Sequence, residues 1–197
     1  ALPISGLTTT QLASLSTDQL ALLTTAQVRS LTTEQIASFT SDQVPLLTTT
    51  QVGALSSTQL RALNSDQLNA LETVDLQALS STQLQSLLTS QVATLSSDQL
   101  QALTTSQVAS LTSSQVRALT SDQLNALESG DLQVLTSAQL PGLTTTQLAS
   151  LSTDQLALLT TAQVRSLTTE QIASFTSDQV PLLTTAQVGA LSSTQLR

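Results

Sequence analysis

The stretch Thr24–Phe39, "TTAQVRSLTTEQIASF", contains an eight-residue pattern twice, and this pattern decides the fold. From Thr8 onward the 197-residue chain repeats the octad without insertion or deletion. We number octad positions one to eight as in Thr24–Leu31, and we count the octads from Thr8. Position four is Gln except at Asp75 and Asp131, position five is Leu, Val or Ile, and position eight is Leu or Phe.

Neither one long helix nor a β-strand suits this pattern. The apolar positions recur at alternating spacings of three and five residues. On a continuous α-helix the apolar stripe would rotate by about 80° per octad, so that no partner surface could follow it. On a strand the odd spacings would place the two apolar positions on opposite faces. The octad is therefore a unit in which a short structure starts afresh.

That unit has the pattern of a capping box. Ser or Thr at position one accepts from the position-four N–H, and the Gln side chain accepts from the position-one N–H. The preceding Leu and the aliphatic position five form the accompanying hydrophobic staple. We expect one short helix per octad, partly 3₁₀, because position six can be Pro. We assign this capping role, and a possible hydrogen-bonded ladder between coils, to Gln11, Gln19, Gln27, Gln35, Gln43, Gln51, Gln59, Gln67, Gln83, Gln91, Gln99, Gln107, Gln115 and Gln123.

One octad cannot fold alone. Burial of two aliphatic side chains contributes about 3–6 kcal/mol, whereas ordering eight residues costs about 8–16 kcal/mol. The sequence therefore predicts an all-α solenoid or superhelix whose octads share a core. The predicted core includes Leu15, Leu20, Leu23, Val28, Leu31, Ile36, Phe39, Leu63, Leu68 and Leu71.

The position-three aspartates suggest the size of one coil. They occur in octads 2, 5, 8, 12, 15, 19 and 22. These gaps of three and four indicate about 3.4 octads per coil, by the reasoning used for amphipathic helices. Duplication history is the alternative explanation. Residues 143–197 repeat residues 7–61 with one change, Thr50 against Ala186. We predict one continuous repeat domain over 1–197, with a partial repeat at 1–7.

The composition excludes most chemistry. The chain has no His, Cys or Lys, so it cannot build a catalytic triad or a Ser–Lys dyad, and we predict no enzyme and no cofactor. A net charge of −8 with five Arg argues against nucleic acid. No apolar run approaches the ~20 residues of a membrane span, so we expect no membrane insertion. The acidic pairs Glu72/Asp75 and Glu128/Asp131 could bind Ca²⁺ or could cap helices. A disordered Ser/Thr-rich stalk is the rival to a folded array.

The phrase "LTTAQVRSLTTEQI" (Leu23–Ile36) resembles the Leu-Thr-Thr-x-Gln-Val octapeptide arrays of large bacterial surface or secreted repeat proteins, often labelled adhesin-like. The resemblance covers residues 7–197. It implies an extracellular or cell-surface location in bacteria and no assigned activity. The phrase also looks like the opening of the TAL-effector repeat, but that family's repeat length, base-reading pair and basic charge are missing.

The uniform array favours a structural protein, namely a rod or filament-forming segment of a bacterial extracellular fibre or adhesin stalk. Its expected partner is a second copy, by end-to-end or lateral self-association. The alternative is a solenoid scaffold that binds a glycan or a peptide. That function predicts a local patch of aromatic or unusual residues on one face, and no such patch is evident in the sequence.

Overall fold

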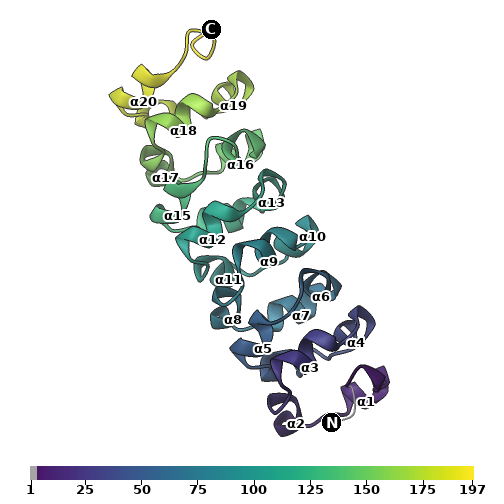
Figure 1. Ribbon diagram of the computed structural model, residues 1–197. Helices are drawn as coiled ribbons and strands as arrows, with labels where there is room; N and C mark the ends of the chain where they lie inside the picture. The colour runs from purple at the N-terminus through teal and green to yellow at the C-terminus, as the bar shows by residue number, and fades with distance from the viewer. Residues whose placement is uncertain (1–3) are drawn as a thin grey trace. The chain divides into compact units, whose positions relative to one another are not determined.

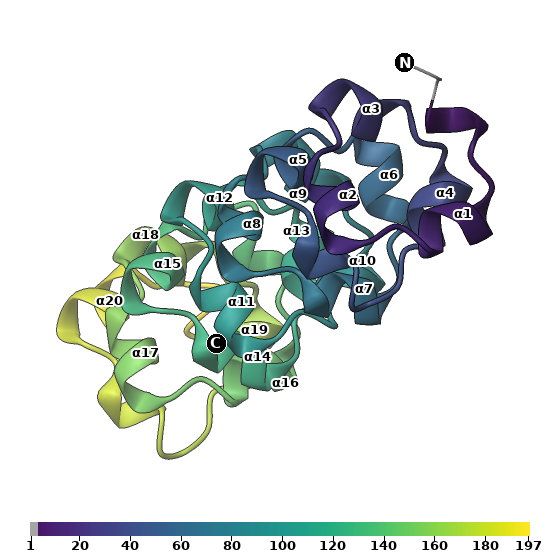
Figure 2. The same ribbon diagram turned by 90° about the horizontal axis from the view of Figure 1, so that it is seen from below.

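The structure is a computed structural model that describes residues 4–197. The chain divides between Leu103 and Thr104 into two compact units, and the division does not interrupt the octad repeat. Within each unit, short helices follow one another in coils (Figures 1 and 2), and the described residues contain no strand. The predicted all-α fold with one short helix per octad is confirmed.

The helices of the first unit are η1 (Ile4–Gly6), α1 (Thr9–Ala13), α2 (Thr17–Ala21), α3 (Thr25–Ser30), α4 (Thr33–Ala37), η2 (Val44–Leu46), α5 (Thr49–Gly53), α6 (Ser57–Ala62), α7 (Ser65–Ala70), α8 (Thr73–Gln77), α9 (Ser81–Ser86), α10 (Thr89–Val92) and α11 (Ser97–Gln101). Those of the second unit are α12 (Thr105–Ser110), α13 (Ser113–Ala118), α14 (Ser121–Ala126), α15 (Ser129–Val134), η3 (Leu140–Gly142), α16 (Thr145–Ala149), α17 (Thr153–Leu158), α18 (Thr161–Ser166), α19 (Thr169–Ala173), η4 (Val180–Leu182) and α20 (Thr185–Ala190).

The third octad illustrates how each helix begins and ends. Thr24 is the N-cap, with extended backbone at φ −71° and ψ 155°. The N–H of Val28 donates to the Thr24 carbonyl at 3.0 Å and closes the first turn. Leu31 is extended again, at φ −63° and ψ 141°. Because positions eight and one are both extended, the chain changes direction after every octad.

Proline at position six converts the helix to the 3₁₀ form. In octad 5 the N–H groups of Leu46 and Leu47 donate to carbonyls three residues earlier, at 3.1 Å each. Proline has no N–H, so it cannot donate the bond that an α-helix needs at this point. The three 3₁₀ helices that contain such a proline are η2, η3 and η4, with Pro45, Pro141 and Pro181.

Two kinds of connection hold successive coils together. Helices pack against helices three octads away, as α6 does against α9 and α12 against α15 (Figure 1). Side-chain hydrogen bonds reach four octads back, as from Gln51 to Leu20 and Leu23. These two steps lie on either side of the predicted 3.4 octads per coil.

The contact across one coil leaves no room for a side chain at Gly142. A Cβ atom there would lie 2.9 Å from the Ser113 carbonyl oxygen. We expect Gly142→Ala to lower the free energy of unfolding by about 1–3 kcal/mol through overpacking. The control is Gly189→Ala within α20, where a Cβ meets nothing within 4 Å and alanine should stabilise by about 0.5–1 kcal/mol. Urea denaturation measures both changes, and equal effects would contradict the expectation.

Candidate functional site

The glutamine at position four links its own helix to the previous coil. The Oε1 atom of Gln59 accepts from the N–H of Ser56 at 2.8 Å, and the Gln59 N–H donates to the Ser56 hydroxyl at 3.3 Å. The Nε2 atom of Gln59 donates to the carbonyls of Val28 and Leu31, at 2.8 Å each. One buried amide therefore satisfies both its acceptor and its donor groups, which removes the usual cost of burying it.

The same connection recurs in both units. In the first unit its Nε2 donors are Gln35, Gln43, Gln51, Gln59, Gln67, Gln83, Gln91 and Gln99. In the second unit they are Gln139, Gln147, Gln155, Gln163, Gln171, Gln179, Gln187 and Gln195. Among the residues that the structure describes, no buried side-chain nitrogen or oxygen lacks a hydrogen-bond partner.

All of the glutamines to which the sequence assigned a capping role lie at the N3 position of a helix or turn. Their Oε1 atoms accept from the position-one N–H, as in Gln11, Gln19, Gln107, Gln115 and Gln123. Gln91 does so although its N-cap residue is Leu88, which has no side-chain oxygen to complete the box. The glutamines of the connection reach the previous coil through their Nε2 atoms, which donate to backbone carbonyls there.

Most of the predicted core is buried. Leu20, Val28, Leu31, Ile36, Phe39, Leu63, Leu68 and Leu71 are all buried. The core prediction is wrong for Leu15 and Leu23, because both are only half-buried. Their counterparts in the second copy, Leu151 and Leu159, are buried. The second copy packs against octads 14–17, which precede it in the chain. No equivalent octads among the described residues cover Leu15 and Leu23.

The acidic pairs separate into one buried and one exposed carboxylate. Asp75 and Asp131 are buried, whereas Glu72 and Glu128 are exposed. Asp75 accepts from the N–H of Glu72 at 3.2 Å. Glu128 begins α15 without a side-chain cap bond. The Glu128 side chain therefore does not take part in a capping box in that octad.

Neither acidic pair is joined by a third ligand. Within residues 4–197 no group of three or more His, Cys, Asp or Glu side chains lies close enough to hold a metal ion. Asp75 instead receives a hydrogen bond from Thr49, and Asp131 receives one from Thr105, each three octads back. An aspartate at position four thus keeps a link to the previous coil, but it has no amide with which to reach the carbonyls there.

The two buried aspartates should make the array more stable in acid. Burial raises the pKa of Asp75 and Asp131, which the hydrogen bonds from threonine only partly offset. A carboxyl with a raised folded-state pKa binds its proton more tightly in the folded chain. The free energy of unfolding is therefore expected to be highest below the ordinary aspartate pKa of 3.8 and to fall as pH rises through the raised value.

Urea unfolding at a series of pH values tests this expectation. The double variant Asp75→Asn, Asp131→Asn should flatten the decline. The matched control is Asp66→Asn, Asp122→Asn, which makes the same change in net charge at exposed positions and should leave the decline in place. Equal flattening by both pairs would assign the effect to overall charge.

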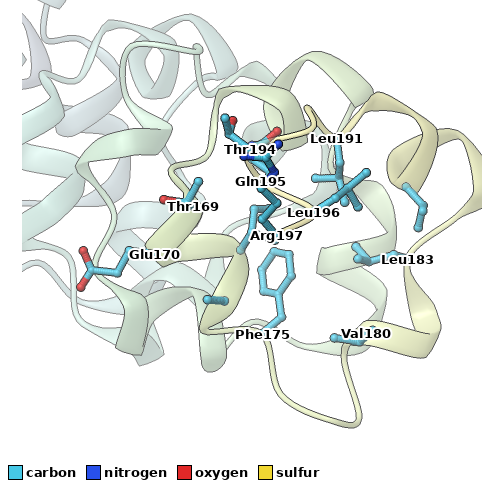
Figure 3. Close-up of a pocket in the computed structure, with 13 residues that line it drawn as sticks. Thr169, Glu170, Phe175, Val180, Leu183, Leu191, Thr194, Gln195, Leu196 and Arg197 are labelled. Atoms are coloured by element: carbon cyan, nitrogen blue, oxygen red, sulfur yellow. The ribbon is translucent and has the colours of Figure 1, made fainter.

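An apolar cavity of about 640 Å³ lies at the C-terminal face of the second unit. Figure 3 shows Phe175, Leu183, Leu191 and Leu196 around it, from the segments that follow α19, η4 and α20. We define the C-terminal face as octads 21–24, residues 168–197. The sequence analysis did not predict this cavity. The only signal for it was the repeat of residues 7–61 at 143–197, which places the same sequence in two different surroundings.

No helix within residues 4–197 is both long enough and apolar enough to cross a membrane. No curated protein matches the chain. The model of one family, described as the ALTTAQ repeat, matches at residues 4–33, 20–49, 49–73, 68–105, 98–128, 124–161 and 156–185. Together these matches extend over nearly all of the octads whose caps and connections are described above. The chain belongs to the ALTTAQ repeat family.

Proposed function

We propose that this chain is a structural segment of a bacterial extracellular fibre or adhesin stalk, in which tandem octads form a load-bearing array. Its role is mechanical, and no octad acts as a specialised site. Membership of the ALTTAQ repeat family supports a repeat protein, and the cell-surface location and the mechanical role are the proposed part.

The observation that carries this proposal is the repeating glutamine connection. Each Gln of this connection holds its own helix start and the backbone of the previous coil. Gln51, for example, accepts from the Thr48 N–H at 2.7 Å and donates to the Leu23 carbonyl at 2.7 Å. Because acceptor and donor come from the same octad pattern, any number of octads can be added by the same bonds. Charged residues at positions three and six are exposed, so they can vary without affecting the connection.

Two measurements test the proposal. Single chains held at Cys residues added to both termini should resist stretching and then lengthen in steps. The length of each step gives the number of residues released, since an extended residue spans at most about 3.5 Å. A featureless entropic stretch would contradict a load-bearing array. Antibodies raised against the chain should label intact cells of a bacterium that encodes it, and labelling only after lysis would contradict the surface location.

A binding scaffold for a glycan or a peptide is the alternative, and the C-terminal cavity is the observation in its favour. In the first copy the corresponding residues are covered by further octads. This cover favours repeat packing over a ligand as the use of that surface. Isothermal titration of the chain with glycan and peptide libraries tests the alternative. Saturable binding that a substitution at Phe175 abolishes would favour it.

A further inference from the structure

Octad 5, residues 40–47, has no glutamine connection from the octad four places ahead. In the first unit, the other octads from 1 to 8 have backbone carbonyls that accept from an Nε2 atom four octads ahead, in Gln43, Gln51, Gln59, Gln67, Gln83, Gln91 and Gln99. For octad 5 the residue at that place is Asp75, which has no amide. Among the residues that the structure describes, no side chain donates to the carbonyls of Val44 and Leu47, although both residues are buried.

The carboxylate of Asp75 does not replace this connection. It accepts from the N–H of Glu72 at 3.2 Å, within its own octad, and from the hydroxyl of Thr49. Thr49 lies in octad 6, so its bond joins octad 9 to octad 6 and does not reach octad 5. Octads 6 and 7, by contrast, are held by Gln83 and Gln91, each with two bonds of 2.7 and 3.0 Å. Each such bond shifts an opening equilibrium by about fivefold.

The helix of octad 5 has few bonds of its own. Proline at position six limits η2 to a 3₁₀ helix of three residues, with Pro45 at its centre. Helix η3 in octad 17 is of the same kind, but the carbonyls of Leu140 and Leu143 accept from Gln171 at 3.0 and 2.7 Å. The two proline octads share a helix type and differ in the connection, so octad 17 is an internal control for octad 5.

We propose that η2 and Leu47 form a release point of the first unit, which opens reversibly while the neighbouring coils stay folded. The inference rests on the proposed structural function and names the segment that yields first under load. Gln43 keeps its bonds to the carbonyls of Leu12 and Ala13, so the opening begins after it. Reclosing is favourable because Val44 and Leu47 return to the core. Segments with few connections open locally at a lower free energy than the rest of a fold.

Native-state hydrogen exchange measured by NMR tests the inference, with each rate divided by that of the unfolded peptide. In the wild type, the N–H groups of Leu46 and Leu47 should exchange at least about tenfold faster than their counterparts in octad 17, because two amide bonds are missing. Those counterparts are Gly142 and Leu143. Asp75→Gln supplies the amide and should slow exchange in octad 5 about tenfold or more. The matched control Asp75→Asn removes the same charge but is one methylene shorter than glutamine, so it should change the rates by less than about threefold.

Gln171→Asp makes the opposite change and should speed exchange in octad 17 at least about tenfold. Equal rates in the two wild-type octads would overturn the release point, and so would equal effects of Asp75→Gln and Asp75→Asn. Stretching of single chains gives a second readout, since Asp75→Gln should raise the force of the first step, and an unchanged force would also overturn it. A chain that resists force but shows equal exchange in both octads would therefore lose the release point and keep its structural function.

Discussion

Replacement of Leu60 by alanine is expected to lower the free energy of unfolding by about 2–5 kcal/mol. Leu60 is fully buried at position five of octad 7, where helix α6 packs against α4 and α9. Truncation removes one methine and two methyl carbons and leaves a cavity, because the neighbouring coils are held by their own hydrogen bonds and cannot close on the gap. Urea denaturation followed by far-UV circular dichroism measures the loss.

The repeat supplies a control of the same sequence. Leu196 occupies the same octad position in the second copy but is exposed, so Leu196→Ala should change the stability by less than about 0.5 kcal/mol. Both variants are measured at low concentration, where self-association does not contribute. If the two substitutions cost the same, the first copy would not be covered by octads 8–11 as the structure describes.

Much of this architecture follows from the local sequence. The Ser/Thr and Gln residues of each octad specify where a helix starts, because both partners of the capping box lie within four residues. The apolar spacing excludes a long helix and a strand, and position five is buried nearly everywhere. Such local features leave the chain few alternatives, so the helices and the core could be read from the octad alone.

Contacts between coils depend on which octads pack against each other, and this pairing cannot be predicted from the sequence of one octad. The amide of Gln59 could have bonded to another glutamine or to the backbone, and only the stacking brings the carbonyls of Val28 and Leu31 within reach. Likewise, Asp75 receives a hydrogen bond from Thr49, which lies three octads back and outside its own octad. Leu15 and Leu23 match the consensus as well as any core leucine, but their exposure depends on neighbours rather than on their own octads.

Gln59→Leu is expected to have the second large effect, a loss of about 3 kcal/mol in the free energy of unfolding. Leucine fills most of the volume of the glutamine but offers no hydrogen bonds. The Ser56 N–H loses its acceptor, and the carbonyls of Val28 and Leu31 lose a donor inside the array. Each lost bond costs about 1 kcal/mol, and a buried group left unpaired costs more.

Gln11→Leu separates the two roles of the glutamine. Gln11 makes the same capping bonds with Thr8 but is exposed, and no described residue accepts from its amide nitrogen. Its replacement should therefore cost only the cap, about 1 kcal/mol or less. The difference between the variants, about 2 kcal/mol, measures the connection to the previous coil. Thermal and urea unfolding of both variants give this difference directly. Equal losses would mean that the glutamine is kept for its cap alone, and the connection on which the load-bearing array depends would contribute nothing to stability.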